Sequence, residues 1–580
     1  MTTRLESNMH RQQSSSQSSL KFNRQPCRRM RCFVTNSCVS LLARSVLALL
    51  LVAHLASATI TRANFIGQAN DAPELLTYAE LGALYDGENT PAPLERKLNQ
   101  LLSVPFVDNS HAAESRLRLS QTPQLGEFLR VAFWNIERGL EYEAIEAAFG
   151  DEARFAASLN EEKYPAAGDA RREVLEQAAA LRAADVIVLN EVDWGIKRTD
   201  YRNVVADLAR GLKMNYAFGV QFIELSPVAL SREPPRADKD ENEILKLIKV
   251  DPARYKGLHG VAILSRYKLE NVRLVPFGHQ PYDWYKSEKR GASLLEKGKR
   301  QVSHRVFLEK TLREVRRGRR MMLLASIADA RFPNGRVTIA ATHLEARTTP
   351  ANRVRQLEEV LNEIKPLRHP VILAGDMNTS TTDLTPTSVH RELTKRIGSK
   401  SFWLKQGINY ATGIGFIQDF AIGGFGFVRT HADPTVRHIP FIAPNPGRKF
   451  FTTLKDFRFD DGGAFDFRGT PGRSIGGSSE TFGNSNERNG KGFVTTYQVN
   501  RPLKVVGKYK LDWIFVKPAY LSDPTDDKEP YRFAPHFGRT LRALNESIED
   551  RISDHRPLIV DLPLGEPPLS ETTAFSLKQK

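Results

Sequence analysis

The chain has 580 residues, of which 41% are hydrophobic and 26% are charged, and its formal net charge is +16. This length allows a large core and more than one domain, and the composition is ordinary for a globular protein. All three cysteines, Cys27, Cys32 and Cys38, lie near the N-terminus. Disulfides and cysteine metal sites are therefore excluded from the mechanism of the remaining chain.

Residues 1–58 have the pattern of a targeting segment. They carry eight Lys and Arg against one acidic residue, and a short apolar stretch, Val46–Ala56, precedes a small-residue cleavage site at Ala58. The apolar stretch is short for a membrane span, so export with cleavage before Thr59 is favoured over an uncleaved membrane anchor. A start at Met30 would give the signal an ordinary length. The protein is expected to be periplasmic or secreted.

The next region, residues 59–125, is predicted to be an N-terminal extension that contains a helix at Glu74–Tyr85. From Phe128 onward strands and helices alternate, beginning with a strand at Leu129–Trp134 and an amphipathic helix at Arg171–Ala184. Further predicted strands are Asp185–Leu189, Tyr216–Ile223, Val261–Leu264, Met322–Ile327, Val337–Ala341, Val371–Ala374, Leu511–Val516 and Pro557–Leu562. Mixed strands and helices over this length predict an α/β or α+β layered core.

Two segments interrupt the strand and helix pattern. Residues 281–320 contain thirteen Lys and Arg, which favours a polyanionic partner such as nucleic acid. Acidic residues are interleaved, so a solvated helix of mixed charge is an equal alternative, and residues 313–320 can also form a sheet edge. Residues 411–490 are rich in Gly and Phe and too long for an ordinary loop. They are predicted to be a functional lid or a partly disordered segment.

Polar side chains recur where predicted strands begin or end. These residues are Asn135, Glu191, His343, Asp376, Asn378, Asp512, Asp554 and His555. Any one of them alone is more simply a turn, cap or core-edge residue. Together, carboxylates, amides and histidines without thiolate suit a hard cation, Mg²⁺, Mn²⁺ or Ca²⁺, and a phosphoester site. The sequence has no GxxxxGK[ST] and no GxSxG, which argues against P-loop nucleotide hydrolysis and against a nucleophile elbow.

Seven segments resemble, in order, the motifs of the endonuclease/exonuclease/phosphatase superfamily. They are FWNIERG, VIVLNEVD, HGVAILSRY, ATHLEA, GDMN, LDWIFV and ISDHRP. The resemblance covers about residues 126–565 as a catalytic domain, with residues 281–320 and 411–490 as insertions and 566–580 as a C-terminal tail. It implies a DNase I-like α/β (α+β) fold, a four-layer sandwich of two mixed β-sheets flanked by helices, with the site where the loops of both sheets meet.

The resemblance implies that Glu191 is the main ligand of a divalent cation. Asn135 and Asp554 would complete or support the metal shell. The expected cofactor is Mg²⁺, with Mn²⁺ or Ca²⁺ as alternatives.

The resemblance also implies the catalytic roles. Asp376 would orient or deprotonate the attacking water, and Asn378 would hold the phosphate. His555, with its tautomer fixed by Asp512, would contact the scissile phosphate and move a proton. His343 stands where phosphatases, sphingomyelinases and DNase I-like members carry a histidine and where abasic-site endonucleases usually carry a tyrosine.

The expected activity is divalent-metal-dependent hydrolysis of a phosphodiester, with nucleic acid favoured as the substrate by the basic segment. A lipid headgroup, as in sphingomyelinases, and an inositol phosphate are the alternative substrates. A secreted binding protein without activity is disfavoured because every motif is complete.

Overall fold

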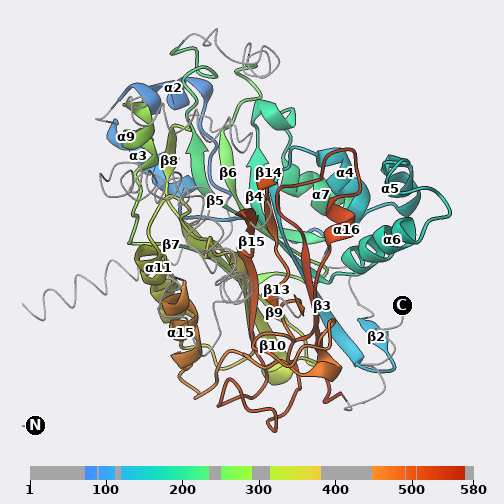
Figure 1. Cartoon of the computed structure of the whole chain (residues 1–580). Coiled ribbons are helices and arrows are strands. Elements are labelled where there is room, and N and C mark those ends of the chain that lie inside the picture. Colours follow the sequence, from blue (N-terminus) through green and yellow to red (C-terminus); the bar gives the residue numbers. More distant parts are fainter. Residues whose placement is uncertain are drawn as a thin grey trace, which may run out of the picture. The chain divides into compact units, whose positions relative to one another are not determined.

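The computed structural model describes residues 72–87, 90–111, 119–233, 250–290, 314–379, 447–489, 492–503 and 506–567 (Figure 1). All of them belong to one compact unit, Ala69–Lys580. The predicted leader lies outside the described residues, as do the centre of the basic segment and the first half of the Gly/Phe-rich segment. No helix in the described part of the chain is both long and apolar enough to cross a membrane.

The larger of two mixed sheets contains β1 (Phe106–Asp108), β2 (Ser120–Thr122), β3 (Gly126–Arg138), β4 (Val186–Trp194), β5 (Asn215–Glu224), β6 (Leu258–Ser265), β8 (Arg316–Gly318), β17 (His536–Thr540) and β18 (Leu558–Pro563). Its order is β1-β5-β6-β4-β3-β18-β17, with β2 beside β3 and β8 beside β5. β3 and β4 are parallel, whereas β18 runs antiparallel to β3. The start of β18 therefore lies next to the end of β3.

The smaller sheet contains β7 (Glu270–Pro276), β9 (Met321–Ala328), β10 (Arg336–His343), β11 (Val371–Asp376) and β16 (Asp512–Lys517). Its order is β16-β11-β10-β9-β7, with β10 and β11 parallel and β16 antiparallel to β11. Two hairpins lie apart from these sheets: β12 (Arg488–Asn489) with β13 (Gly492–Phe493), and β14 (Tyr497–Leu503) with β15 (Val506–Tyr509). Every strand predicted from the sequence overlaps an observed strand.

Helices cover the outer faces of the two sheets (Figure 1). They are α2 (Tyr78–Asp86), α3 (Ala92–Leu101), α4 (Tyr142–Phe149), α5 (Glu152–Ser158), α6 (Asp169–Arg182), α7 (Val204–Leu212), α9 (Trp284–Lys289), α11 (Pro350–Ile364), α15 (Arg448–Asp456) and α16 (Arg542–Asn545). Side chains of α4, α6 and α7 pack on the larger sheet, and those of α11 and α15 pack on the smaller one. The predicted amphipathic helix is α6, and α11 was not predicted.

Alternation along the strands builds the layers. Val131 and Phe133 of β3 belong to the core between the two sheets, whereas Ala132 and Trp134 belong to the core under the helices. Successive side chains of a strand point to opposite faces, so a strand that is apolar throughout is buried on both. The order is therefore helices, sheet, sheet, helices, and the predicted four-layer sandwich is confirmed.

The predicted N-terminal extension contributes to this domain. β1 pairs with β5 and β2 pairs with β3, so both are strands of the larger sheet. Leu81 and Leu84 of α2 and Leu98 of α3 are buried in the core beneath the helices. The helix predicted at Glu74–Tyr85 is α2, which begins at a capping box between Thr77 and Glu80. Residues 72–87, 90–111 and 119–125 therefore pack as part of the same compact unit.

The described half of the Gly/Phe-rich segment is core, so the prediction of a lid is wrong for residues 447–489. Phe450 and Phe451 of α15 are buried in the core on the outer face of the smaller sheet. The ring centroids of Phe451 and Trp513 of β16 are 4.7 Å apart. The glycines interrupt the apolar period that would identify a buried helix or strand, and the phenylalanines are instead buried mainly from loops.

Replacing Phe451 with alanine is expected to lower the free energy of unfolding by about 3–5 kcal/mol, because it leaves a cavity in a close-packed aromatic cluster. Chemical denaturation measures this change. The matched control is Phe457→Ala, since Phe457 lies at the end of the same helix and is only partly buried. A mobile lid would tolerate both substitutions about equally, and that result would contradict the assignment to the core.

Candidate active site

Three predicted site residues lie in one row across the smaller sheet. His343 of β10 is in register with Asp376 of β11, and Asp376 is in register with Asp512 of β16. All three side chains are buried. Paired residues of adjacent strands point to the same face, so the register itself brings an imidazole and two carboxylates together.

His555 joins this row from the other sheet. It lies just before β18, and its Nδ1 is 2.8 Å from Oδ2 of Asp512. The Oγ of Ser553 accepts a hydrogen bond from the backbone N–H of His555 at 3.1 Å and donates one to the carbonyl of Asn135 at 2.8 Å. β16 and β18 belong to different sheets. The histidine and its carboxylate meet across the sandwich.

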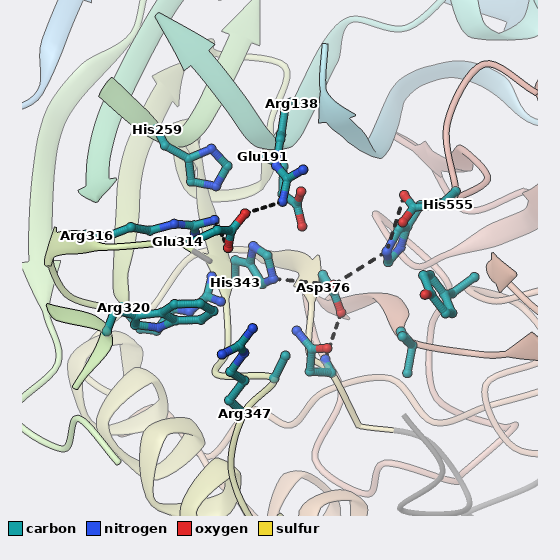
Figure 2. A pocket seen from close by; sticks show the side chains of 16 residues that line it. Arg138, Glu191, His259, Glu314, Arg316, Arg320, His343, Arg347, Asp376 and His555 are labelled. Atoms are coloured by element: carbon teal, nitrogen blue, oxygen red, sulfur yellow. Dashed lines mark hydrogen bonds and ion pairs between the residues drawn. The ribbon is translucent and has the colours of Figure 1, made fainter. Parts of the chain in front are cut away.

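The free ring nitrogen of His555 points toward two more carboxylates (Figure 2). Its Nε2 is 3.9 Å from Oδ2 of Asp376 and 4.0 Å from Oδ1 of Asp554. Burial lowers the pKa of His555, but the charges of Asp512 and Asp554 outweigh burial and raise that pKa well above its usual value. The ring can therefore hold a proton near neutral pH.

Asp376 sits between two histidines. Its Oδ2 is 3.4 Å from Nε2 of His343, and its Oδ1 accepts a hydrogen bond from the backbone N–H of Asn378 at 2.8 Å. Burial and the charge of Asp512 raise the pKa of Asp376 to about 7. Asn378 has a positive φ of 46° and donates from Nδ2 to the carbonyl of Leu344 at 3.0 Å. Asn378 thus orients Asp376 and also lines the pocket.

Glu191 reaches the site from a bulge in β4. Its φ is 54°, and the pairing register of β4 shifts between Leu189 and Val192. A second bulge in β3 follows Asn135. Bulges re-aim side chains and often occur beside active sites, and left-handed backbone at a non-glycine residue costs energy that the surrounding fold must supply.

Asn135 supports Glu191 through one end of its amide and is itself held at the other end. Its Nδ2 donates to Oε1 of Glu191 at 3.2 Å, and its Oδ1 accepts from the backbone N–H of Glu137 at 3.1 Å. Burial raises the pKa of Glu191, but the positive charge of Arg138 and the neighbouring histidines bring it below its usual value. The geometry thus gives Asn135 an orienting role and leaves Glu191 as a carboxylate in the pocket.

The donor set fits a hard divalent cation. Glu191 and Asp554 line the pocket, and the Glu137 carboxylate accepts from the backbone N–H of Asp554 at 2.9 Å. Burial and the charge of Asp554 raise the pKa of Glu137 to about 8, which reflects crowded negative charge that a cation would relieve. Oxygen donors of this kind suit Mg²⁺, Mn²⁺ or Ca²⁺.

A second place for a cation is defined by Asp376, Asp512 and His555. One ligand atom from each lies within 4.8 Å of the others. Two of these groups already pair, because Asp512 binds Nδ1 of His555. Glu191 and Asp554 therefore stay the predicted ligands, whereas Asn135, the third residue of the predicted metal shell, uses both ends of its amide on protein groups.

Comparison with known proteins now places the chain. The model of the endonuclease/exonuclease/phosphatase family matches residues 132–555, a span that holds every predicted site residue. The chain belongs to this family. Members of the family are phosphoester hydrolases, and that is the class of this enzyme.

Solved structures with a similar arrangement share little sequence with this phosphoesterase. An endonuclease/exonuclease/phosphatase from Beutenbergia cavernae DSM 12333 is 18% identical, with 76% of this chain and 73% of that chain covered and a TM-score of 0.33. A 3′-5′ exonuclease from Neisseria meningitidis is 12% identical, covering 75% and 99% of the two chains with a TM-score of 0.33. The human Nocturnin catalytic domain is 13% identical, covering 75% and 93% with a TM-score of 0.30. No curated protein matches significantly.

Several pocket residues of this phosphoesterase were missed from the sequence. They are Arg138, His259, Trp284, Glu314, Arg316, Arg320, Arg347 and Tyr497. Two of them, Arg138 and His259, lie within motifs that were noted, and Arg316 and Arg320 lie in the basic stretch 313–320. Their positions in a motif or in the basic stretch were therefore the only sequence signal that these residues belong to the site. Their roles depend on neighbours that are distant in sequence.

His259 and His343 are both neutral at the pocket wall. Nδ1 of His259 is 2.8 Å from Oδ1 of Asp193, and burial lowers the pKa of His259. Burial, together with the charge of Arg320, lowers the pKa of His343 well below its usual value. Nδ1 of His343 is buried and has no hydrogen-bond partner among the described residues. His259 and His343 are therefore suited to hydrogen bonding, whereas the nearby His555 is suited to proton transfer.

Proposed function

We propose that the protein is a divalent-metal-dependent phosphodiesterase that acts on nucleic acid. The observation that supports this best is the row of His343, Asp376 and Asp512, which the His555 ring joins from the other sheet while Glu191 lies across the same pocket. These residues would supply a proton-transfer group, a group that activates water and a carboxylate for a cation, which phosphoester hydrolysis requires.

Each residue would have one task. Asp376, with its pKa of about 7, would orient and deprotonate the attacking water. His555 would contact the scissile phosphate through Nε2 and donate a proton to the leaving oxygen, while Asp512 holds its other nitrogen. The neutral His343 and the second Nδ2 hydrogen of Asn378 would donate to phosphate oxygens. A cation held by Glu191 and Asp554 would supply Lewis-acid stabilisation of the phosphoryl charge when bound.

The charge of the pocket supports a polyanionic substrate such as nucleic acid over sphingomyelin. Arg316 and Arg320, from the end of the basic segment, line the pocket together with Arg138 and Arg347. A phosphocholine headgroup would bring a quaternary ammonium against these guanidinium groups, so a sphingomyelin substrate is disfavoured. The leader at residues 1–58 supports the further proposal that the enzyme acts outside the cytoplasm.

The proposal is tested by measuring hydrolysis of plasmid DNA, single-stranded RNA, inositol phosphates, sphingomyelin and bis(p-nitrophenyl) phosphate. Each assay is run with Mg²⁺, Mn²⁺, Ca²⁺ or EDTA. We expect metal-dependent cleavage of DNA or RNA and slower cleavage of the nitrophenyl diester. Hydrolysis of sphingomyelin or inositol phosphate alone would overturn the nucleic-acid assignment, and equal activity in EDTA would overturn the metal dependence.

A further inference from the structure

One wall of the pocket is a cluster of guanidinium groups braced by an aromatic side chain (Figure 2). The guanidinium carbons of Arg316 and Arg347 lie 4.8 Å and 4.6 Å from the ring centroid of Trp284. That of Arg320 lies 5.1 Å from the ring of Phe222. Stacking on aromatic faces holds these planar groups in place and adds cation–π stabilisation. The three groups, here called the arginine wall, come from β8, the turn before β9 and the loop before α11.

Carboxylates hold two of these arginines from behind. Oε2 of Glu345 accepts from Nε of Arg320 at 3.3 Å and from Nε1 of Trp284 at 3.0 Å. Glu288 pairs with Nη1 of Arg347. Neither glutamate lines the pocket, whereas both arginines do. The ion pairs therefore fix the orientation of the Arg320 and Arg347 guanidinium groups, whereas Arg316 pairs with Glu314, which itself lines the pocket.

The arginine wall has donors to spare. Within the described part of the chain, Nη2 of Arg320 and Nη2 of Arg347 have no hydrogen-bond partner, and neither atom is fully enclosed. Arg320 itself is only 4% exposed. A network that served stability alone would have no need to leave unpaired donors on Arg320 and Arg347 at the wall of a pocket, because burying charge is costly.

We propose that the arginine wall is a subsite for a second phosphate of the substrate, next to the scissile phosphoester. The inference rests on the proposed function and makes it more specific. Guanidinium groups held in fixed planes bind phosphate through paired N–H donors, with geometric specificity that a single ammonium lacks. In a nucleic-acid strand, a second phosphate lies next to the scissile one and could bind at the arginine wall. Sphingomyelin and simple diesters lack the second phosphate.

The test compares three thymidine dinucleotides, one without a terminal phosphate, one with a 5′-phosphate and one with a 3′-phosphate. Bis(p-nitrophenyl) phosphate serves as the substrate with a single phosphate. The variants are Arg347→Met, Arg347→Lys and the control Arg273→Met, whose residue lies on β7 and is half exposed. Binding of pyrophosphate is measured by calorimetry on the same proteins, and thermal unfolding shows whether each variant is folded.

We expect wild-type kcat/KM to be higher for one of the phosphorylated dinucleotides. Arg347→Met should reduce that preference by about 10–100-fold, as expected for the loss of charged hydrogen bonds. It should affect the nitrophenyl diester much less. Arg347→Lys should retain fold and charge beside Glu288 but lose most of the preference, because it lacks the planar fork. Arg273→Met should behave like the wild type.

Two outcomes separate this inference from the proposed function. If the diesters are cleaved but a terminal phosphate gives no advantage and Arg347→Met changes nothing, the subsite is overturned and the phosphodiesterase stands. If no phosphoester is cleaved, the proposed function fails, and pyrophosphate binding then decides the subsite. Binding that is lost in Arg347→Met and kept in Arg273→Met supports it, and binding equal in all proteins overturns it.

Discussion

Replacing His555 with alanine is expected to lower kcat by on the order of 10²–10⁴-fold, the usual range for a positioned proton-transfer group, with a smaller change in KM. The ring is held by Asp512 at 2.8 Å, and its other nitrogen points toward Asp376. Among the described residues that line the pocket, the other two histidines, His259 and His343, have lowered pKa values and are poorer proton donors. Steady-state kinetics on the nitrophenyl diester measures the effect.

The partner variant tests whether His555 and Asp512 act as one unit. Asp512→Asn should also slow the reaction, since the amide no longer stabilises the protonated ring, and the double variant should be little slower than His555→Ala alone. The control is His369→Ala, because His369 bonds Thr338 at the opposite end of β10. Multiplicative losses in the double variant would show independent roles, and a fully active His555→Ala would remove the assignment.

Replacing Glu191 with glutamine is expected to lower kcat/KM by on the order of 10²–10³-fold, comparable to removal of one preorganised electrostatic group. The amide keeps the size of the side chain but loses the charge that attracts a cation. The apparent affinity for Mg²⁺ should fall with it, so a high Mg²⁺ concentration should restore part of the rate. Titrating the activity against Mg²⁺ gives the rate and the apparent affinity for Mg²⁺. Calorimetry measures the binding of Mn²⁺ directly.

The control for Glu191 is Glu358→Gln, an exposed carboxylate on α11. It should leave both metal affinity and rate unchanged. If Glu191→Gln kept wild-type Mn²⁺ affinity while Asp376→Asn lost it, the cation would belong to the group of Asp376, Asp512 and His555. If EDTA left the wild-type rate intact, no metal role would remain for either position.

The sequence by itself determined the layers and part of the inventory of the site. Alternation such as that between Val131 and Ala132 depends only on which face a side chain takes along its own strand, so the buried strands could be predicted locally. Polar residues at strand ends, such as Asp376 after Val371–Ala374, were visible for the same reason. Motif order then predicted the family, which the match over residues 132–555 confirmed.

Only the tertiary structure decided how these residues meet. Asp512 and His555 come from different sheets, and their contact depends on the packing of one sheet on the other. The bulge that turns Glu191 into the pocket depends on pairing with β3 and β6. No local pattern reports a register shift, because a bulge is defined by two strands.

The arginine wall and the Phe-rich core show the same limit. A run of basic residues has one pattern whether it is solvated or lines a cleft. The placement of Arg316 and Arg320 depends on Trp284, 32 positions before Arg316, and on Glu345, 25 positions after Arg320. Phe451 is buried against Trp513, which lies 62 positions later in the chain. The glycines of its segment interrupt the apolar periodicity that would have predicted this burial. Local sequence patterns indicate on which face of its own helix or strand a residue lies. A site is formed by contacts between elements, and these contacts exist only once the chain has folded.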